Sequence, residues 1–353
     1  KGKFHLYPYQ LPSLDRLDQL MRTLKRYDES VKVDRQKPSA ELKMDDPLWP
    51  GRFIRIAIWI PPRVWDGFTT ITLRRQVVEF LSLEEQAGTE SIPYEALEMI
   101  ISLIKCFRNK IIAGPVNSGK TTFANTIVGE QMLSATNALG VVMIEKHPES
   151  TLPYHIKGHR IVPVKAENSE LMDVGIESLR HNPNIIYMTE MRYNEWEFFL
   201  WSGSKGYDGI TGTFHTVDSE DIPYQGAFAV YTRVGGELKG HLISALQACE
   251  LVFIMESVDV EKESKKRLTR ISEICFNEEE KTVYANDIMR YSPKKKRWEY
   301  NDQISPEFLQ KCERKNPLAT KKFLDEIKML AKKYPMEESP LKESRRSQLI
   351  LQS

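Results

Sequence analysis

Residues 114–121 constrain the fold of this chain more than any other segment, because they spell the complete phosphate-binding loop Gly-Pro-Val-Asn-Ser-Gly-Lys-Thr. Glycine lets the backbone wrap closely around a polyphosphate, and a helix that begins at the loop turns its N-terminal N–H groups toward the anion. Residues 110–113 have the apolar character of a short buried strand, and residues 121–128 predict a helix without a breaker. The segment therefore predicts a strand, a phosphate-binding turn and a helix, in this order.

Two side chains of the loop add to the chemistry of its backbone. Lys120 brings a cation to the polyphosphate, and Thr121 is placed to hold Mg²⁺ through its hydroxyl. We therefore expect a nucleotide and its magnesium ion here, the alternative being a glycine loop that binds nothing. The predicted nucleotide-binding residues of this segment are Gly114, Pro115, Val116, Asn117, Ser118, Gly119, Lys120, Thr121 and Thr122.

The composition is typical of a soluble globular protein and excludes several classes. A chain of 353 residues, 41% of them hydrophobic, can bury one large or two moderate cores, so we expect two domains and a tail. A net charge of +1 offers no global field that would attract nucleic acid, so direct nucleic-acid binding is not expected. No apolar run approaches the roughly 18 to 20 residues that cross a bilayer, and membrane contact is predicted to be peripheral. The four scattered cysteines, which form no C-x-x-C pair and favour a reducing cytoplasm over a zinc site, are Cys106, Cys249, Cys275 and Cys312.

The pattern of elements divides the chain into four segments and predicts an α/β fold. Residues 1–81 predict a small α+β domain, because a helical stripe is followed by two strand-like runs. Residues 82–100 predict a linker and the start of a helix that leads into the phosphate loop. Residues 101–300 alternate strands and helices, which is typical of a mostly parallel sheet covered by helices, and end in small antiparallel hairpins. Residues 301–353 predict a helical, partly mobile tail.

Polar side chains follow three of the predicted parallel strands. Glu145 and Glu149 come after one strand, Glu190 after the next along the chain, and His215 after a third. The carboxyl ends of parallel strands meet at one edge of a sheet, so these side chains are expected near the phosphate loop. A nucleotide hydrolase needs one carboxylate for the attacking water, another for the magnesium shell and a polar group near the γ-phosphate. The alternative for any single glutamate is a solvated strand end.

The motifs resemble, in order and spacing, those of the traffic ATPases of bacterial type II and type IV secretion, pilus assembly and conjugation. The similarity covers roughly residues 35–300. Besides the phosphate loop, the family carries an acidic box, which residues 144–149 match here. Its R-x-x-P-D and G-E-x-R motifs are matched by residues 180–184 and 189–192, and its His box by residues 206–209 and 213–215. The hairpins after Ser257 are most similar to the branch that serves tight-adherence pili and conjugation-type secretion.

The resemblance implies an ATP- and Mg²⁺-dependent motor with a RecA-like domain. It implies that Glu149 polarises the attacking water, that Glu190 belongs to the magnesium shell together with Thr121, and that Arg192 makes charge contacts at the site. His215 is implied as the catalytic-site residue of the His box. Hydrolysis would open and close the clamp between the RecA-like domain and the N-terminal domain.

The family's assembly and place in the cell are implied in the same way. Six subunits form a ring in the cytoplasm, in peripheral contact with the inner face of the cell membrane, and an integral membrane platform protein is the partner. Arg74, and with it Arg52, is implied as an N-terminal-domain residue that reaches the nucleotide phosphates.

Four positions differ from the family's motifs, namely Lys146, Asn184, Thr189 and Tyr207. Two other functions stay open. One is a RecA-like motor that acts directly on nucleic acid. The other is a nucleotide-gated scaffold, a ring subunit that binds ATP but hydrolyses it weakly, which the changes at Lys146 and Tyr207 would favour.

Overall fold

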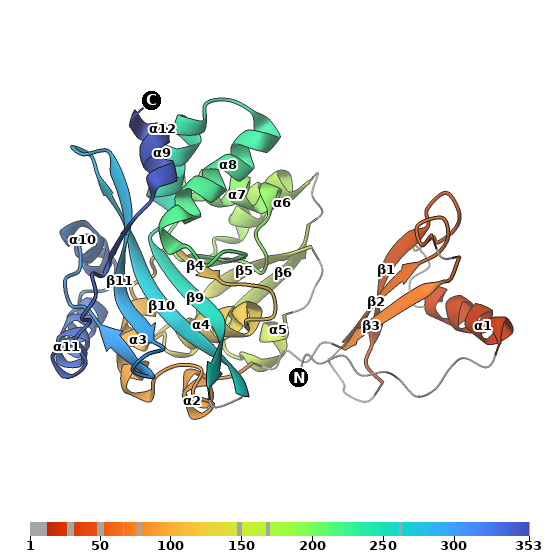
Figure 1. The fold of residues 1–353 in the computed structure, drawn as a ribbon, viewed down its shortest axis with the longest axis horizontal. Coiled ribbons are helices and arrows are strands. Elements are labelled where there is room, and N and C mark those ends of the chain that lie inside the picture. The colour runs from red at the N-terminus through yellow and green to blue at the C-terminus, as the bar shows by residue number, and fades with distance from the viewer. Residues whose placement is uncertain are drawn as a thin grey trace. The chain divides into compact units, whose positions relative to one another are not determined.

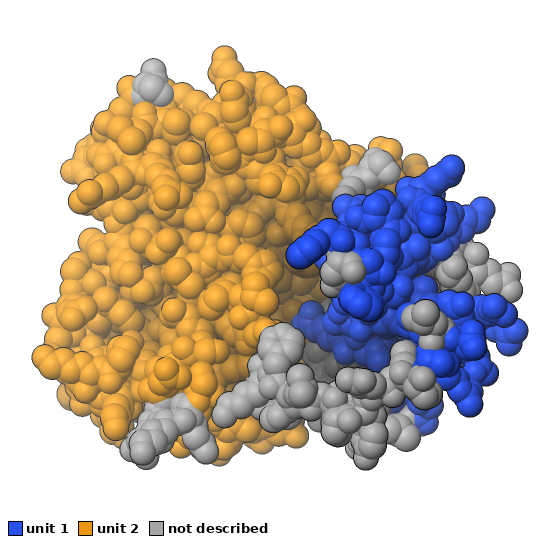
Figure 2. Space-filling model, turned by 45° about the vertical axis from the view of Figure 1, so that its right-hand side comes forward, with its two compact units in different colours: residues 1–79 blue, residues 80–353 orange. Residues whose placement is uncertain are grey.

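The chain divides into two compact units, Lys1–Glu79 and Phe80–Ser353, in the computed structural model (Figure 2). The structure describes residues 13–26, 32–47, 53–65, 67–75, 80–146, 150–166, 170–260 and 263–352. Among these residues, no helix combines the length and the apolar character needed to cross a bilayer.

The first unit pairs one helix with a three-stranded antiparallel sheet. Its elements are α1 (Leu14–Lys25), β1 (Ser39–Asp45), β2 (Phe53–Trp59) and β3 (Thr70–Arg75), in the sheet order β1-β2-β3. Leu24 of α1 packs with Ile56 and Ile58 of β2 in a small core. The helix and the two later strands agree with the predicted α+β pattern, whereas β1 was not predicted.

A ten-stranded sheet organises the second unit (Figure 1). Its strands are β4 (Lys110–Ala113), β5 (Gly140–Glu145), β6 (Arg160–Lys165), β7 (Ile185–Met188), β8 (Ile210–Phe214), β9 (Leu251–Val260), β10 (Glu263–Asn277), β11 (Thr282–Ser292), β12 (Arg297–Tyr300) and β13 (Leu341–Glu343). The order is β12-β11-β10-β9-β4-β8-β7-β5-β6, with β13 paired to β11. The strands from β9 to β6 in this order are parallel, and β10 to β12 continue the sheet antiparallel. The predicted α/β fold with C-terminal hairpins is confirmed, and the hairpins extend the main sheet.

Helices cover both faces of this sheet. They are α2 (Leu83–Gly88), α3 (Leu97–Ile104), α4 (Lys120–Leu133), α5 (Leu152–His155), α6 (Leu171–Ser178), α7 (Tyr193–Ser204), α8 (Ile222–Val234), α9 (Leu238–Ala248), α10 (Pro306–Lys315), α11 (Pro317–Lys333) and α12 (Arg345–Gln352), with 3-10 turns at Tyr94–Ala96, Leu179–His181 and Ser219–Asp221. Strand β4 is buried on both faces of the sheet. The side chain of Ile112 belongs to one hydrophobic cluster, whereas those of Ile111 and Ala113 belong to the other. A parallel strand that is buried on both faces reads as the continuous apolar run that the sequence shows.

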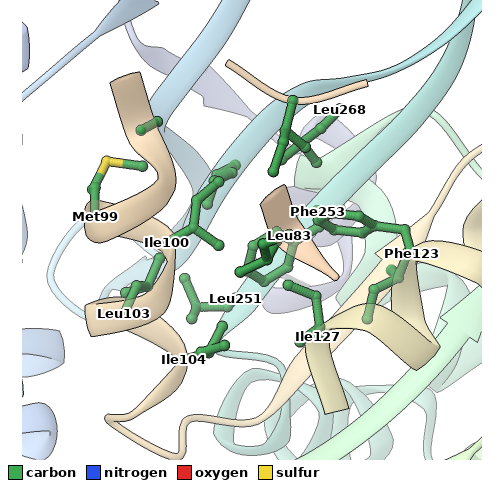
Figure 3. Packing of buried hydrophobic residues seen from close by; sticks show 14 of the residues in the cluster. Leu83, Met99, Ile100, Leu103, Ile104, Phe123, Ile127, Leu251, Phe253 and Leu268 are labelled. Atoms are coloured by element: carbon green, nitrogen blue, oxygen red, sulfur yellow. The ribbon is translucent and has the colours of Figure 1, made fainter. Parts of the chain in front are cut away.

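The first cluster fixes the phosphate-loop helix against the sheet. In Figure 3, Phe123 and Ile127 of α4 point toward Leu251 and Phe253 of β9. The side chains that α3 contributes to the same cluster in this view are Met99, Ile100, Leu103 and Ile104. All of them are fully buried, so α4 and the loop before it rest on a rigid base.

The segments predicted as a linker and as a tail both pack within the second unit. Residues 82–100 begin with a capping box at Ser82 and Glu85, and Leu83 is buried in the first cluster. In the C-terminal segment, Phe323 of α11 is fully buried in the same cluster. Amphipathic helices with polar outer faces read as polar sequence even where their inner face is core, which is why composition alone suggests a linker and a mobile tail.

A lysine is fully buried at the start of β4. Lys110 Nζ donates to Gln131 Oε1 at 3.2 Å and to Thr211 Oγ1 at 3.3 Å. Burial lowers the pKa of Lys110 to about 7, and the charge of Arg108 lowers it further, whereas Glu250 acts in the opposite direction. The unfolded chain therefore binds a proton at Lys110 that the folded chain gives up above pH 7.

We expect this lysine to make stability rise with pH. The cost of holding Lys110 charged is fully present below pH 7 and fades as the pH climbs toward 10.5, its ordinary pKa. Compared with Lys110→Met, the wild-type free energy of unfolding should gain about 2 kcal/mol between pH 7 and pH 9. Urea unfolding of both proteins at the two pH values measures this gain. A constant difference between them would show that the pKa is not shifted.

Candidate nucleotide-binding site

The predicted phosphate loop leaves β4 at the carboxyl edge of the parallel strands. It runs from Gly114 to Gly119, and α4 begins at Lys120. Three of its residues have positive φ, namely Gly114 at 145°, Asn117 at 63° and Gly119 at 94°. These values turn the backbone back on itself, which glycine tolerates without strain and asparagine tolerates better than most residues. The sequence Gly-x-x-Asn-x-Gly is therefore what this turn requires.

The loop is also closely packed against β9. A Cβ atom at Gly114 would lie 2.0 Å from the carbonyl oxygen of Met255 and 2.8 Å from Ser118 Oγ. Ser118 Oγ itself is buried and has no hydrogen-bond partner within the described part of the chain. An unpartnered buried hydroxyl costs free energy, and a phosphate oxygen in the loop would remove that cost. The loop therefore fits the anion that its sequence predicts.

Lys120 is held inside the site rather than extended into solvent. Only 6% of its surface is exposed, and its Nζ donates to the carbonyl oxygen of Pro115 at 2.7 Å. The same atom lies 3.2 Å from Nδ1 of His215. Burial lowers the pKa of Lys120 to about 8, with Glu190 raising it and Lys266 lowering it. The charge of a bound phosphate would favour the protonated lysine.

Glu190 and His215 meet beside Lys120, as the sequence predicts for residues that follow parallel strands, and Arg192 contacts Glu190. Arg192 donates to Glu190 Oε1 from Nε at 3.1 Å and from Nη2 at 3.0 Å. His215 Nε2 lies 3.7 Å from the same oxygen. Burial lowers the pKa of His215, and the charge of Lys120 lowers it further, so the ring is neutral at pH 7. Glu190 remains 44% exposed on its side chain, which leaves its carboxylate open to water and a hydrated ion.

The remaining predicted residues of α4 occupy its first turn. Thr121 and Thr122 are half-buried, and the carbonyl oxygen of Thr122 accepts from Thr126 Oγ1 at 3.1 Å. Within the described ranges, no group of three or more His, Cys, Asp or Glu side chains is placed to hold a metal ion. Mg²⁺ often keeps several waters and takes substrate phosphates with one or two protein ligands, so Thr121 and a water-bridged Glu190 suit it.

Three other predicted residues lie outside the described part of the second unit. Glu149 and Arg52 lie outside the described residues. Arg74 lies on β3 in the first unit, where it is exposed and pairs in register with Arg55. Glu145 is buried, and its Oε1 accepts from the backbone N–H of Ser150 at 3.1 Å, so it joins the end of β5 to Ser150.

The four departures from the family's motifs fall at two different edges of the sheet. Asn184 and Tyr207 precede β7 and β8, so they lie at the amino edge, away from the phosphate loop. Asn184 Oδ1 accepts there from the backbone N–H of Gly140 at 2.8 Å. Thr189 and Lys146 follow β7 and β5, at the edge of the site. Only these two departures therefore bear on the chemistry at the loop.

Sequence reasoning missed the contribution of β9 and β10 to this site. The backbone of Met255 closely approaches Gly114, and Cδ of Lys266 would lie 3.3 Å from a Cβ atom at Gly119. Both residues lie more than 130 positions after the loop, and no motif marks them. One feature of the sequence could have indicated this contribution. Residues 251–260 form a strand-like run much longer than the four-residue β4, so the run must extend beyond β4 if the two strands pair.

The comparisons with solved structures establish the fold. The Legionella pneumophila ATPase DotB is 16% identical, with 77% of this chain and 71% of that chain covered and a TM-score of 0.53. The pilus retraction motor PilT, solved with bound ADP, is 13% identical, with 95% and 83% covered and a TM-score of 0.51. The VirB11 ATPase of the Brucella suis type IV secretion system is 19% identical, with 73% and 82% covered and a TM-score of 0.42. No family model and no curated protein matches the sequence.

At these identities, the likeness to DotB and PilT is one of fold. The chain has a RecA-like α/β domain preceded by a smaller α+β domain, as the motifs predict. The predicted resemblance to the traffic ATPases is therefore confirmed at the level of the fold.

Proposed function

We propose that this chain is a Mg²⁺-dependent ATPase that works as the hexameric motor of a type IV secretion, conjugation or pilus-assembly machine. The observation that carries the proposal is the convergence of Lys120, His215 and Glu190 at a loop with phosphate-binding geometry. A phosphate loop alone is shared by kinases, switches and motors. The added carboxylate and histidine at the ends of neighbouring strands are what hydrolysis requires.

Each residue has a definite task in this proposal. The loop N–H groups and Lys120 bind and orient the β- and γ-phosphates. Thr121 and Glu190 would hold Mg²⁺, Glu190 through water, and the ion would neutralise charge that develops on the phosphates. His215, whose Nδ1 lies 3.2 Å from Lys120 Nζ, would sense the γ-phosphate and so distinguish ATP from ADP. Arg192 fixes the Glu190 carboxylate through two hydrogen bonds. The role of Glu149 with the attacking water rests on the sequence resemblance.

The test is phosphate release from Mg-ATP by the purified chain and by Glu190→Gln. The substitution keeps the size of the side chain but removes the charge that orders the ion and its waters. We expect kcat to fall on the order of 100-fold, with KM changed only a fewfold. Glu177→Gln, at an exposed position on α6, removes the same charge elsewhere and should leave kcat unchanged. Equal activity of Glu190→Gln and wild type would contradict the assignment of Glu190.

The assembly and the partners belong to the same proposal. A ring of six subunits is expected to show in light scattering as a sixfold mass in the presence of ATP. The proposed location is the cytoplasm, at the inner face of the cell membrane, beside an integral membrane platform protein that affinity purification from the native cell would recover. Stimulation of hydrolysis by single-stranded DNA instead would favour the nucleic-acid motor. Tight ATP binding with negligible turnover would favour the gated scaffold.

A further inference from the structure

Strand β9 continues beyond the strand it pairs with and forms an arm beside the phosphate loop. The last residue of β4, Ala113, pairs with Ile254, whereas β9 runs on to Val260. Residues 255–260 pair instead with residues 263–268 of β10, and Figure 1 shows the two teal strands projecting together past the parallel strands. We call residues 255–260 and 263–268 the β9–β10 arm.

The arm places a lysine on the loop. A Cβ atom at Gly119 would lie 3.3 Å from Cδ and 3.9 Å from Cβ of Lys266, so the stem of this side chain rests on the last loop residue before Lys120. Lys266 is exposed, and its charge lowers the pKa of Lys120. The two ammonium groups are therefore close enough to interact.

The arm is anchored so that this lysine keeps its orientation. Lys265 and Arg267, its neighbours on the opposite face of β10, both pair with Glu90 Oε2, at 2.6 Å and 3.0 Å. The Arg267 guanidinium also lies 4.8 Å from the ring centroid of Tyr291 and 5.2 Å from that of Trp298. Side chains alternate along a strand, so fixing residues 265 and 267 on one face directs Lys266 to the other, toward the loop.

The order of the strands indicates which part of a nucleotide Lys266 meets. β8 and β7, which carry His215 and Glu190, lie on one side of β4, and β9 and β10 lie on the other. In the proposed function Lys120 and His215, which lie 3.2 Å apart, meet the γ-phosphate, so that end of the nucleotide would lie on the β8 side. Lys266 approaches the loop from the opposite side, where the inner phosphates of the nucleotide would lie.

We propose that Lys266 is a second cationic nucleotide-binding residue, which contacts the α- and β-phosphates that ATP and ADP share. The inference rests on the proposed function, since it assumes that the loop binds a nucleoside polyphosphate. A lysine suits this position because its flexible stem and compact charge adapt to phosphate oxygens without a fixed geometry. A contact with the inner phosphates strengthens the binding of ATP and ADP equally and leaves the hydrolytic step alone.

The experiment measures the affinity of the full chain for fluorescent ADP and for a fluorescent non-hydrolysable ATP analogue, together with steady-state hydrolysis. Lys266→Ala is expected to weaken both affinities roughly tenfold and by the same factor, with kcat within about twofold of wild type. Lys266→Arg should retain most of the affinity. Lys239→Ala, which removes the same charge at an exposed position on α9, is the matched control and should bind like wild type.

The outcomes separate this inference from the function on which it rests. If wild type binds and hydrolyses ATP but Lys266→Ala binds as tightly as Lys239→Ala, the role of Lys266 is wrong and the ATPase stands. A loss confined to ATP would also overturn it, because the contact would then be with the γ-phosphate. If wild type binds neither nucleotide, the proposed function fails first. Thermal unfolding without nucleotide, expected to be unchanged in all variants, shows that exposed Lys266 is not needed for folding.

Discussion

Replacement of Lys120 by alanine is expected to reduce ATP hydrolysis on the order of 100- to 1000-fold and to abolish measurable nucleotide binding. The reason is the position of its ammonium group, which is almost enclosed between the carbonyl oxygen of Pro115 and the His215 ring. A bound phosphate at this place would have no other enclosed cation among the described residues of the loop. Phosphate release and fluorescent-nucleotide titration measure the two losses.

The loss of activity in Lys120→Ala should not come from unfolding. Burial lowers the pKa of this lysine, so the folded protein holds the charge at a cost that the substitution relieves. Alanine also suits the first position of α4, since it is the best helix former. Lys239→Ala, at an exposed position on α9, is the control for loss of one positive charge. Without nucleotide, Lys120→Ala should melt at the wild-type temperature. Added ATP should raise the melting temperature of Lys239→Ala but not that of Lys120→Ala.

The core of the site was predictable because local sequence and sheet topology specify it together. The loop motif marks its own turn, and the apolar run before it marks a central strand. Glu190 and His215 are 25 positions apart in sequence, yet both follow parallel strands, and such strands end at one edge. That rule predicts the two side chains to be neighbours, and Glu190 Oε1 lies 3.7 Å from His215 Nε2.

Strand β1 and the position of Lys266 could not be predicted from the sequence, because both depend on pairing between strands. β1 has only Leu42 as a buried hydrophobic residue, and its run Ser-Ala-Glu-Leu-Lys-Met-Asp becomes a strand by pairing with β2. The position of Lys266 depends on the register of β10 against β9 and on how far β9 extends beyond β4. A shift of one residue in that register would exchange Lys266 for its neighbours Lys265 or Arg267.

The effect of a residue that differs from the family's motifs depends on where the fold places it. Asn184 and Tyr207 weaken the match to the family's motifs, yet their place at the amino edge of the sheet separates them from the loop. Thr189 lies at the carboxyl edge, where its carbonyl oxygen accepts from Thr213 Oγ1 at 2.6 Å and helps to join the ends of β7 and β8. This residue therefore fits the site as part of its framework, so a departure in sequence does not by itself imply lost turnover.

Gly114→Ala is expected to lower the free energy of unfolding by about 3 to 5 kcal/mol and to remove nucleotide binding. The new Cβ atom would lie 2.0 Å from the carbonyl oxygen of Met255 and 3.0 Å from its carbonyl carbon. Both are backbone atoms of β9, so relief requires the loop or the strand to move. The φ of 145° adds strain for any side chain. Urea unfolding and nucleotide titration of the full chain measure the two effects.

Gly206→Ala separates the clash from the backbone strain. Gly206 also has a positive φ, 81°, but a Cβ atom there meets nothing within 4 Å. Gly206→Ala should lower the free energy of unfolding only by the strain of a positive φ for alanine, about 1 kcal/mol, and should leave nucleotide affinity unchanged. If the two variants lost the same stability, the close approach of β9 to the loop would not matter energetically. A larger loss in Gly114→Ala, together with lost binding, would mean that the arm strand and the phosphate loop hold their shapes only as a pair.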